Sequence, residues 1–327
     1  MPDSSLLAPE SLGATISIGE ILVEIMAVTR GAGFLEPQEL IGPYPSGAPA
    51  IFIDQCARIG GSAGAVGSVG DDDFGRLNVG RLQRDGADVS AIRVDTVYPT
   101  GSAFVRYRTD DARDFVYNIA HSAAERIEWT DAVGALIARA GHLHVMGTAL
   151  SMPSVWALIE VAAPRIRARG GSISLDPNLR KELTVDEQVR ARFEHLIEMT
   201  DLLLPSGEEL ERAACVAGKY QALDTLFEHG VREVVLKRGA DGAQLFGRDG
   251  TCIEAPAFHV CELDPTGAGD CFGGAYVACR RLGIDAAESL TYASAAGARN
   301  VTYRGPMEGA GSREELNDFI RQTPRSR

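Results

Sequence analysis

The residues best suited to chemistry lie in one glycine-rich segment near the carboxyl end of the chain, Asp264 to Asp270, with the sequence DPTGAGD. Apolar residues follow it at the i, i+3, i+4, i+7 spacing of a buried helix face, so the segment is predicted to lie at a helix N-terminus. The first N–H groups of a helix lack partners within it and the dipole is positive there, which favours phosphate oxygens. Gly267 and Gly269 allow positive φ angles and the close approach of an anion.

A carboxylate at the mouth of this anion site needs a chemical reason, because it would otherwise repel the ligand. Asp270 can act as a general base that accepts the proton of an attacking hydroxyl, while nearby N–H groups stabilise a phosphoryl group in transfer. The alternative is an ordinary helix N-cap in which Thr266 or Asp270 binds the end amides. Cys271 follows at the helix start, where a thiol pKa can be lowered, but we expect it to be structural.

Composition narrows the class of protein. A chain of 327 residues allows one large α/β domain or two smaller ones, and 45% hydrophobic residues are ample for a core. The net charge of −13 argues against nucleic-acid binding, which needs clustered basic residues. No run of 18 apolar residues occurs and the first residues lack a signal-peptide pattern, so we expect a cytoplasmic protein with no membrane partner.

Cysteine and histidine patterns do not indicate a metal centre. The six cysteines include no CxxC pair and mostly lie in apolar patterns, which is typical of reduced, buried thiols. The six histidines have no HExxH or other ligand spacing, so we interpret them as structural.

Hydrophobic periodicity predicts a chain that alternates strands and helices over most of its length. Strands are predicted at 15–25 and 65–69, helices at 48–60 and 75–86, and several short strands between 90 and 120. Further along, the predicted strands are 142–146, 172–175, 201–204 and 232–237, and the predicted helices are 153–169, 186–199, 207–217 and 221–229. A hairpin at 242–251, the helix that contains Asp270, and helices at 286–302 and 312–322 complete the pattern. Such alternation is typical of an α/β protein with a parallel sheet covered by helices.

Two stretches predicted to contain strands and no helix, 20–46 and 90–120, indicate a small lid of β-strands beside this α/β body. Polar residues fall at predicted strand ends, where an open parallel sheet forms its binding crevice. These residues are Glu24, Asp176 to Arg180, Pro205 to Glu209, Lys237 to Gly239, and Asp270. Arg180 can hold a phosphate or a sugar hydroxyl through paired donors. The alternative for this segment is a proline-containing turn capped by Asp176.

Two other nucleotide-binding patterns fit poorly. Gly70 to Arg76 (GDDDFGR) has Arg where a Walker A loop needs Lys, and its three carboxylates would repel phosphate. We interpret it as a turn into a helix, although such an acidic run can bind a cation. Gly267, Gly269 and Gly273 have the spacing G-x-G-x-x-x-G and lie too near the carboxyl end to begin a Rossmann sheet.

Together these residues resemble the ribokinase/PfkB family of carbohydrate kinases, from about Thr15 to Gly311. Asp264 to Gly274 fits the second signature of that family at each step. Further matches, in the required order, are Gly19 and Glu20, Gly70 to Gly75, Thr100 and Gly101, Asp176 to Arg180, and Lys237 to Gly242. The resemblance implies a ribokinase-like α/β fold, in which a central, mostly parallel sheet has helices on both faces and a small β-sheet lid closes over the sugar. We expect this kinase domain at 13–311, with lid strands within about 20–46 and 90–120, and a C-terminal helix and tail at 312–327.

The same resemblance implies an ATP-dependent sugar kinase that uses Mg²⁺. Asp270 is then the catalytic base, and the amides of Gly267, Ala268 and Gly269 form the anion hole for the γ-phosphate. The nucleotide site is implied to include Ser206, Lys237, Gly239, Gly242, Gly267, Gly269 and Asn300. Glu209 is implied to organise Mg²⁺ indirectly, although Ser206 replaces the usual Asn of that motif. Asp264 matches a position near a monovalent cation site, so activation by K⁺ is a weaker hypothesis.

The substrate site departs from the family pattern. Within Ser46 to Ile51, Ile51 replaces an Asn that would bind a sugar hydroxyl, and Glu24 stands where many relatives have Asp. The segment Tyr117 to Ala123 lacks the Arg that 2-keto-3-deoxygluconate kinases use for the substrate carboxylate, and an unpaired buried charge is costly. Arg106 and Arg108, which alternate with Tyr107, could substitute for that Arg. The residues expected to bind substrate are Glu24, Gly47, Ile51, Phe104, Arg106, Tyr117, Asn178, Arg180 and Asp270.

We therefore favour transfer of phosphate to a primary hydroxyl of a neutral ketohexose such as tagatose or fructose, with a 2-keto-3-deoxygluconate kinase as the alternative. A non-catalytic sugar or nucleotide sensor is disfavoured by the retention of Asp270, and a dinucleotide-dependent oxidoreductase by the glycine spacing. Relatives often pair through their lid sheets, so a homodimer is expected.

Overall fold

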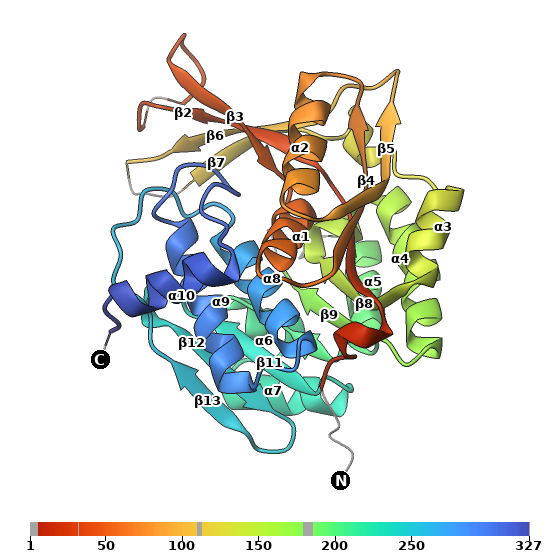
Figure 1. The fold of residues 1–327 in the computed structure, drawn as a ribbon, viewed down its shortest axis with the longest axis vertical. Helices are drawn as coiled ribbons and strands as arrows, with labels where there is room; N and C mark the ends of the chain where they lie inside the picture. Colours follow the sequence, from red (N-terminus) through yellow and green to blue (C-terminus); the bar gives the residue numbers. More distant parts are fainter. Residues whose placement is uncertain (1–5, 32, 110–112, 179–185, 327) are drawn as a thin grey trace.

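Two β-sheets organise the chain, a large sheet that forms the body and a small one that forms a lid (Figure 1). The computed structural model describes residues 6–31, 33–109, 113–178 and 186–326. Within these residues, the order of strands in the large sheet is β13 (Cys252–Ala255), β12 (Ala243–Gly247), β11 (Glu233–Lys237), β10 (Leu202–Leu203), β9 (Ser172–Asp176), β8 (Ala140–Met146), β1 (Ala14–Ile18), β4 (Ala63–Gly70) and β5 (Asp88–Asp95). The strands from β11 to β5 run parallel, and β12 and β13 extend one edge as an antiparallel hairpin.

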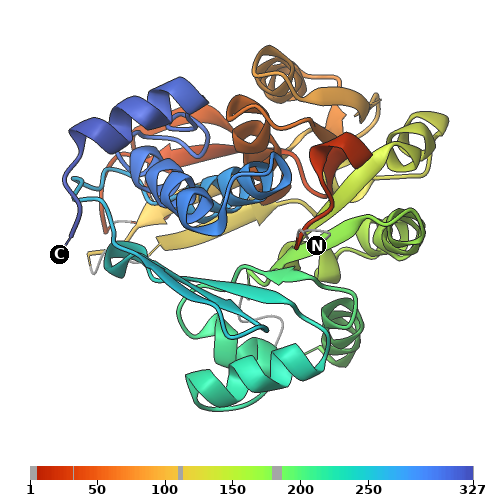
Figure 2. The same cartoon turned by 60° about the horizontal axis from the view of Figure 1, so that its bottom comes forward.

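Helices cover both faces of the large sheet (Figure 2), each set with its own hydrophobic core. One face carries α3 (Asp131–Ala138), α4 (Pro153–Ala168), α5 (Glu187–Ile197), α6 (Glu209–Ala214) and α7 (Lys219–Glu228). The other carries α1 (Ala48–Arg58), α2 (Asp73–Arg84), α8 (Ala268–Arg281), α9 (Ala286–Asn300) and α10 (Arg313–Gln322). Short 3₁₀ turns lie at Glu10–Leu12, Ala123–Glu125, Gly147–Ser151 and Gly239–Asp241. The α/β class predicted from periodicity is confirmed. No helix in the described part of the chain has the length and apolar character needed to cross a membrane.

The central strands are buried on both faces, which explains their apolar sequences. Every residue of β4 and of β8 is buried. Two of the β8 residues are His142 and His144, and their ring nitrogens bind the hydroxyls of Ser172 and Ser174 on β9. Burial lowers the pKa of both imidazoles well below the usual range, so the rings are neutral and serve the packing of the sheet.

The lid lies across one end of the body (upper left in Figure 1). Its strands are ordered β3 (Leu40–Ser46), β2 (Leu22–Ala27), β6 (Gly101–Tyr107) and β7 (Arg113–Asn118). β2 and β6 are parallel, and the other two pairs are antiparallel. The predicted small strand-built sheet is therefore present.

The sequence predictions are wrong at three places. The single strand expected at 15–25 is two strands in different sheets, because the chain turns at Gly19 and Glu20 while its apolar pattern continues. The segment 90–95, expected in the lid, pairs with β4 and belongs to the large sheet. Alternation identifies a strand but not the sheet it joins. Helix α3 was not predicted.

The carboxyl-terminal helix packs on the same core as α8 and α9. A capping box of Ser312 and Glu315 starts α10, and Leu316 is fully buried among the residues of this core. The segment expected to follow the kinase domain thus contributes to its packing.

Candidate active site

The candidate site lies at the carboxyl ends of the parallel strands, where the strand order reverses between β1 and β8. Glu20 follows β1, and its carboxylate accepts hydrogen bonds of 3.0 Å and 3.1 Å from the hydroxyl of Thr148, which follows β8. Asp176 ends β9 and Lys237 ends β11. Asp176 and Lys237, two of the polar residues that the sequence places at strand ends, therefore meet at this edge of the sheet. We call the region between this edge and the lid the crevice.

The predicted anion site lies at the amino terminus of α8, at the same edge of the sheet. Gly267 is the N-cap residue with a φ of 79°, and a Cβ at this position would overlap the carbonyl oxygen of Pro306. No side chain caps the helix, so the alternative of an N-cap formed by Thr266 or Asp270 is wrong. A Cβ added to Gly269 would lie 3.5 Å from the Lys237 ammonium nitrogen, which places a cation beside the first turn of α8. The N–H of Ala268 donates a long hydrogen bond of 3.4 Å to the Pro265 carbonyl oxygen.

Asp270 lies in the first turn of α8, among other carboxylates. Burial, followed by the charge of Asp176, raises the pKa of its carboxyl to about 8, although the charge of Lys237 opposes the shift. Glu20 and Glu24 add smaller contributions in the raising direction. A carboxyl group with a pKa near neutrality can both accept and return a proton, as a general base must.

Cys271 is fully buried behind Asp270, and burial raises its thiol pKa well above the usual value, in agreement with a structural role. The expectation of mostly buried thiols holds for Cys56, Cys271 and Cys279. It is wrong for Cys215, Cys252 and Cys261, which are exposed.

Asp176 and Lys237 form an ion pair across the crevice. Asp176 also accepts a hydrogen bond of 3.3 Å from the N–H of Asn178, whose φ is 39°. The carboxylate therefore caps this turn, which agrees with the alternative interpretation of the segment as a proline-containing turn capped by Asp176. Arg180 lies outside the described residues.

The residues expected at the nucleotide form the adjoining part of the edge. Ser206 forms a bridge with Lys237, and its N–H donates to the Glu209 carboxylate at 2.7 Å. Gly239 and Gly242 both have positive φ angles, and a Cβ on Gly242 would overlap the carbonyl oxygen of Ala255. No group of three or more His, Cys, Asp or Glu side chains that could hold a metal ion occurs in the described ranges.

Asn300 and Asp264 support the loop before the anion site. The fully buried Asn300 amide donates to the Thr266 carbonyl oxygen at 2.8 Å and accepts from the Gly309 N–H at 3.2 Å. The buried Asp264 carboxylate accepts hydrogen bonds of 3.0 Å and 2.9 Å from the N–H groups of Thr266 and Gly305. These contacts make both residues part of the loop framework, and their roles toward adenine and a monovalent cation stay predictions.

The lid contributes its inner face to the crevice. Glu24 on β2 accepts a hydrogen bond of 2.8 Å from the Ser46 hydroxyl, and its ladder partner on β6 is Ala103, which in turn pairs with Tyr117 on β7. Side chains of directly paired residues share a face, so Glu24 and Tyr117 project to the same side. Gly47, with a φ of 108°, turns the chain from β3 into α1 so closely over Glu20 that no Cβ fits.

Three residues expected to bind substrate are placed differently. Phe104 and Arg106 lie on the opposite face of the lid from Tyr117, where Phe104 contacts the ring of Phe34 and Arg106 pairs with Asp114 at 2.6 Å. This placement on the other face from Glu24 and Tyr117 corrects the expectation that Phe104 and Arg106 bind the substrate. Ile51 is 2% exposed and packs in the core of α1.

Two contributors were missed, Tyr107 and Arg113, whose side chains reach the loop before α8 from the inner face of the lid. Alternation along 103–108 predicts two faces, and Tyr107 shares a face with Ala103. Which face meets the body depends on how the two sheets pack, and the pattern of one strand does not contain that information.

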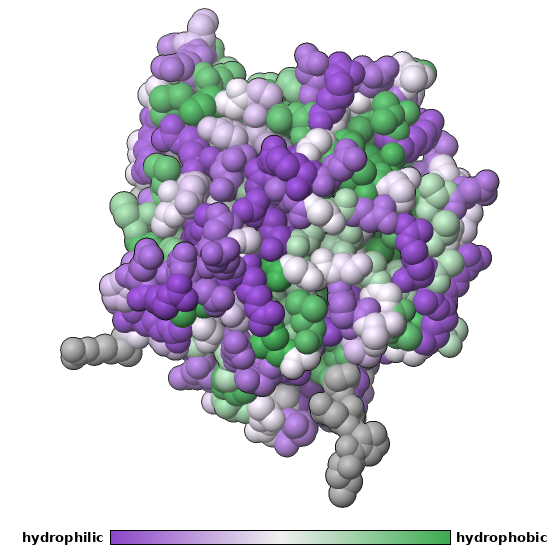
Figure 3. All heavy atoms as spheres, in the orientation of Figure 1, coloured by the Kyte–Doolittle hydropathy of each residue, from purple (hydrophilic) through white to green (hydrophobic). Residues whose placement is uncertain are grey.

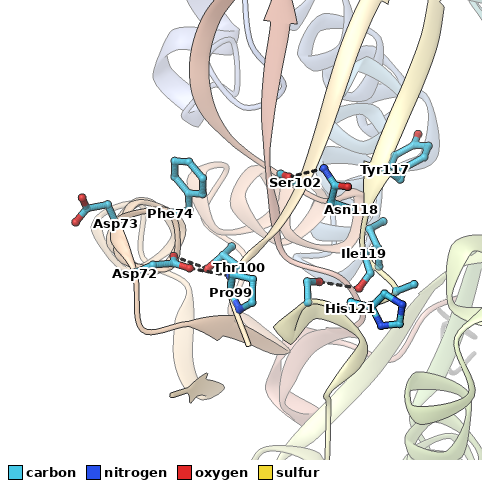
Figure 4. Close-up of a pocket in the computed structure, with 12 residues that line it drawn as sticks. Asp72, Asp73, Phe74, Pro99, Thr100, Ser102, Tyr117, Asn118, Ile119 and His121 are labelled. Carbon is cyan, nitrogen blue, oxygen red and sulfur yellow. Dashed lines mark hydrogen bonds between the residues drawn. The ribbon is translucent and has the colours of Figure 1, made fainter. Parts of the chain in front are cut away.

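A pocket of about 660 Å³ opens at the joint between lid and body (Figure 4). Its lining is Asp72, Asp73, Phe74, Pro99, Thr100, Ser102, Tyr117, Asn118, Ile119, Ala120, His121 and Ser122. Asp72 caps α2 by accepting from the Gly75 N–H at 2.8 Å, and it accepts from the N–H and hydroxyl of Thr100 at 2.8 Å and 2.7 Å. The turn into α2 is confirmed, and it lies at the joint between lid and body.

These features define a class of enzyme. A parallel α/β sheet whose crevice combines a helix N-terminus, a carboxylate of raised pKa and a covering lid is suited to phosphoryl transfer to a small polar acceptor. Residues 15–312 match the pfkB family of carbohydrate kinases, and the chain belongs to this family. It is therefore a sugar kinase.

Individual relatives agree with this assignment. A 2-dehydro-3-deoxygluconokinase of Thermoproteus tenax is 30% identical, with 95% of each chain covered. A fructokinase of Escherichia coli is also 30% identical, with 91% of this chain and 96% of the relative covered. A solved structure of a provisionally named ribokinase II from E. coli, in complex with ATP and Mg²⁺, is 41% identical and superposes with a TM-score of 0.89 over 95% of this chain and 99% of that one. The predicted family, ribokinase-like fold and kinase class are confirmed.

Proposed function

We propose that this kinase uses ATP and Mg²⁺ to phosphorylate a primary hydroxyl of a neutral ketohexose such as tagatose or fructose. The observation that carries the proposal is the position of Asp270, one turn into α8, with the N–H groups of residues 267–269 beside it and Lys237 next to Gly269. A base and an anion site that lie together at the end of one helix are what transfer of phosphate to a hydroxyl requires.

In the proposed reaction each group of the crevice has one task. The carboxylate of Asp270 accepts the proton of the sugar hydroxyl as the sugar oxygen attacks the γ-phosphorus. The bond between the γ-phosphorus and the β–γ bridging oxygen breaks, and ADP leaves with that oxygen. The amides of Gly267, Ala268 and Gly269 donate hydrogen bonds to the phosphoryl oxygens, and the Lys237 ammonium adds positive charge at the same place. The lid excludes water, which would otherwise compete with the sugar as acceptor.

The residues present fit an indirectly held Mg²⁺. This ion usually keeps several waters and binds through one or two carboxylates together with the substrate phosphates, and when bound it neutralises phosphate charge. Glu209 supplies one carboxylate at the edge of the crevice, fixed against the backbone of Ser206. We propose that Glu209 orients the waters of the ion, and that Ser206, Gly239 and Gly242 line the nucleotide beside it.

The charge of the crevice favours a neutral sugar. The charges that act most strongly on Asp270 are those of three carboxylates, Asp176, Glu20 and Glu24, and of one ammonium group that is already paired with Asp176. A sugar acid would meet repulsion here. Of the two expected partners for its carboxylate, Arg106 lies on the outer face of the lid, and Arg108 is exposed just after the end of β6. The 2-keto-3-deoxygluconate alternative keeps the support of the Thermoproteus relative, which is named for that activity.

An ADP-release assay over a panel of acceptors tests the proposal. The panel contains tagatose, fructose, psicose, sorbose, 2-keto-3-deoxygluconate, ribose and adenosine. We expect a neutral ketohexose to give the highest kcat/KM. Higher kcat/KM for 2-keto-3-deoxygluconate would replace the proposed substrate by the alternative, and binding of sugar and ATP without ADP release would indicate a sensor.

The role of Asp270 has its own test. We expect Asp270→Asn to keep the fold, checked by circular dichroism, and to lower kcat by at least ~10²-fold, the effect of losing a general base. Near-normal turnover in this variant would refute the assignment of Asp270 as the base.

We also propose that the protein forms a homodimer through the outer face of its lid. Exposed apolar side chains gather on the lid, where Val28, Leu35, Leu40 and Val116 are 44%, 95%, 42% and 51% exposed. Hydrophobic residues interrupt the polar surface of this region at the upper left of Figure 3. Leu40 and Val116 lie on strands of the lid, and Val28 and Leu35 lie in the segment between β2 and β3. An exposed apolar patch of this kind is suited to a subunit interface. A cytoplasmic location stays a prediction.

A further inference from the structure

Two side chains of the lid bind the loop that leads into the anion site. Tyr107 and Arg113 are directly opposite each other in the β6–β7 ladder. The Tyr107 hydroxyl donates to the Asp264 carboxylate at 2.6 Å, and the Arg113 guanidinium donates to the Thr266 hydroxyl at 2.9 Å. One cross-strand pair of the lid therefore holds two residues of the same short loop.

That loop determines where the anion-site N–H groups point. Asp264 accepts from the N–H groups of Thr266 and Gly305, so its carboxylate fixes the turn that ends at Gly267. The positive φ of Gly267 and its close approach to Pro306 leave this turn little freedom. The Tyr107 hydroxyl links the lid to that carboxylate through a hydrogen bond.

The same face of β7 connects the loop contact to the sugar side of the lid. The Arg113 guanidinium lies over the ring of Phe115, 5.8 Å from its centroid. The Phe115 ring stacks in turn on Tyr117, with centroids 5.3 Å apart and planes inclined by 7°. A continuous row of three packed side chains thus joins Tyr117, which is proposed to contact the sugar, to the loop before α8.

We propose that Tyr107 and Arg113 are positioning residues that make the geometry of the anion site depend on the position of the lid. The inference rests on the proposed function. When the lid lies over a sugar, the two side chains hold Asp264 and Thr266, and the N–H groups of residues 267–269 are set for the γ-phosphate. When the lid is displaced, the loop loses both bonds. These two lid contacts would thus make phosphate transfer depend on whether a sugar is bound under the lid.

Tyr107→Phe tests the first contact. Loss of a hydrogen bond to a buried carboxylate is expected to lower kcat by ~10-fold or more, while the sugar KM changes by less than ~3-fold. Tyr98→Phe is the matched control, because it removes a tyrosine hydroxyl near the base of the lid that contacts neither Asp264 nor Thr266. A Tyr107→Phe enzyme with wild-type kcat would overturn the proposal.

A double-mutant cycle tests the second contact. Arg113→Met and Thr266→Val each remove one partner of the bond and keep similar side-chain volumes. We expect the double variant to be no slower than the slower single variant, since both changes break the same bond. Arg113→Lys, which retains one cationic donor, should recover part of kcat. Fully additive losses, or no recovery by Lys, would contradict the proposed contact.

Hydrogen exchange gives a readout that does not need activity. Amides of 264–270 should exchange faster in Tyr107→Phe than in the wild type, and sugar binding should protect them in the wild type alone. Equal exchange in both proteins would refute the coupling. A wild type that phosphorylates no sugar would refute the proposed function instead, and exchange in the ligand-free proteins would still decide whether the lid orders the loop.

Discussion

Asp270 shows how the environment of one residue determines the pH at which it can act. A general base must be deprotonated to accept a proton, and burial together with Asp176 raises the pKa of this carboxyl to about 8. At pH 7 only about one-tenth of the free enzyme would have Asp270 ionised. We therefore expect kcat/KM for the sugar to rise with pH and to level off above about pH 8, measured in a constant-ionic-strength buffer series.

Replacement of Asp176 should change the pH at which kcat/KM rises. In Asp176→Asn the negative charge that favours protonation of Asp270 is removed, while the Lys237 charge that opposes protonation is retained. The acidic limb of the kcat/KM profile should shift to lower pH by roughly one unit. Asp249→Asn, an exposed change in the β12–β13 turn, is the control and should leave the limb in place. An unshifted limb in Asp176→Asn would mean that another group titrates.

The sequence motif correctly located a helix N-terminus with Asp270 in its first turn, but residue identity did not predict which lid side chains contact the loop before it. Asp270 and the glycines were found because a helix N-terminus is built by adjacent residues, so a local motif contains the whole arrangement. Tyr107 and Asp264 are separated by 157 positions. Their contact exists only because two sheets pack together, and the same packing turns Phe104 and Arg106 away from the crevice.

At the scale of elements, α8 carries the anion site at one end and a structural clamp at the other. Arg281, the last residue of α8, has a fully buried side chain. Its guanidinium donates to the carbonyl oxygens of Ala8, Pro9 and Gly13 and to the Thr15 hydroxyl, and it pairs with Glu10 at 3.2 Å. One side chain thus fastens the amino-terminal segment and the start of β1 to the helix that presents Asp270.

Loss of this clamp should destabilise the whole domain. Arg281→Met leaves several buried oxygens and Glu10 without their donor, so we expect the free energy of unfolding in urea to fall by about 3–5 kcal/mol. Arg321→Met is the control, since it removes an exposed ion pair with Asp318 on α10 and should cost at most about 1 kcal/mol. Similar stability of the two variants would show that the clamp is not needed.

Element prediction succeeded where one periodicity dominated a segment and failed where two elements shared a continuous pattern. Helices α1, α2 and α9 were located because the 3.6-residue period and glycine or cap signals agree. β1 and β2 were joined because apolar residues continue through the turn at Gly19 and Glu20. That turn places the Glu20 carboxylate against Thr148, so the misread position is also part of the crevice.

At the scale of the molecule, the two faces of the lid have different tasks. The inner face carries Glu24, Tyr107 and Arg113 and meets the crevice. The outer face carries Leu40 and Val116, both largely exposed, around the Arg106–Asp114 ion pair. The inner face of the lid is directed to the crevice, which leaves the outer face available for another contact. We propose that a second copy of the chain packs on this outer face.

The dimer can be tested on that outer face. We expect the wild type to elute as a dimer in size-exclusion chromatography with light scattering, and Val116→Glu to weaken the dimer by at least ~10-fold, because a charge would be buried in an apolar contact. Val94→Glu is the matched control: this valine is 54% exposed, close to the 51% of Val116, but lies on β5 at the far edge of the large sheet. Its dimer should be unchanged. Equal thermal midpoints of the two variants would show that Val116→Glu acts on association rather than on folding. A monomeric wild type, or dissociation by both substitutions alike, would remove the lid as the interface.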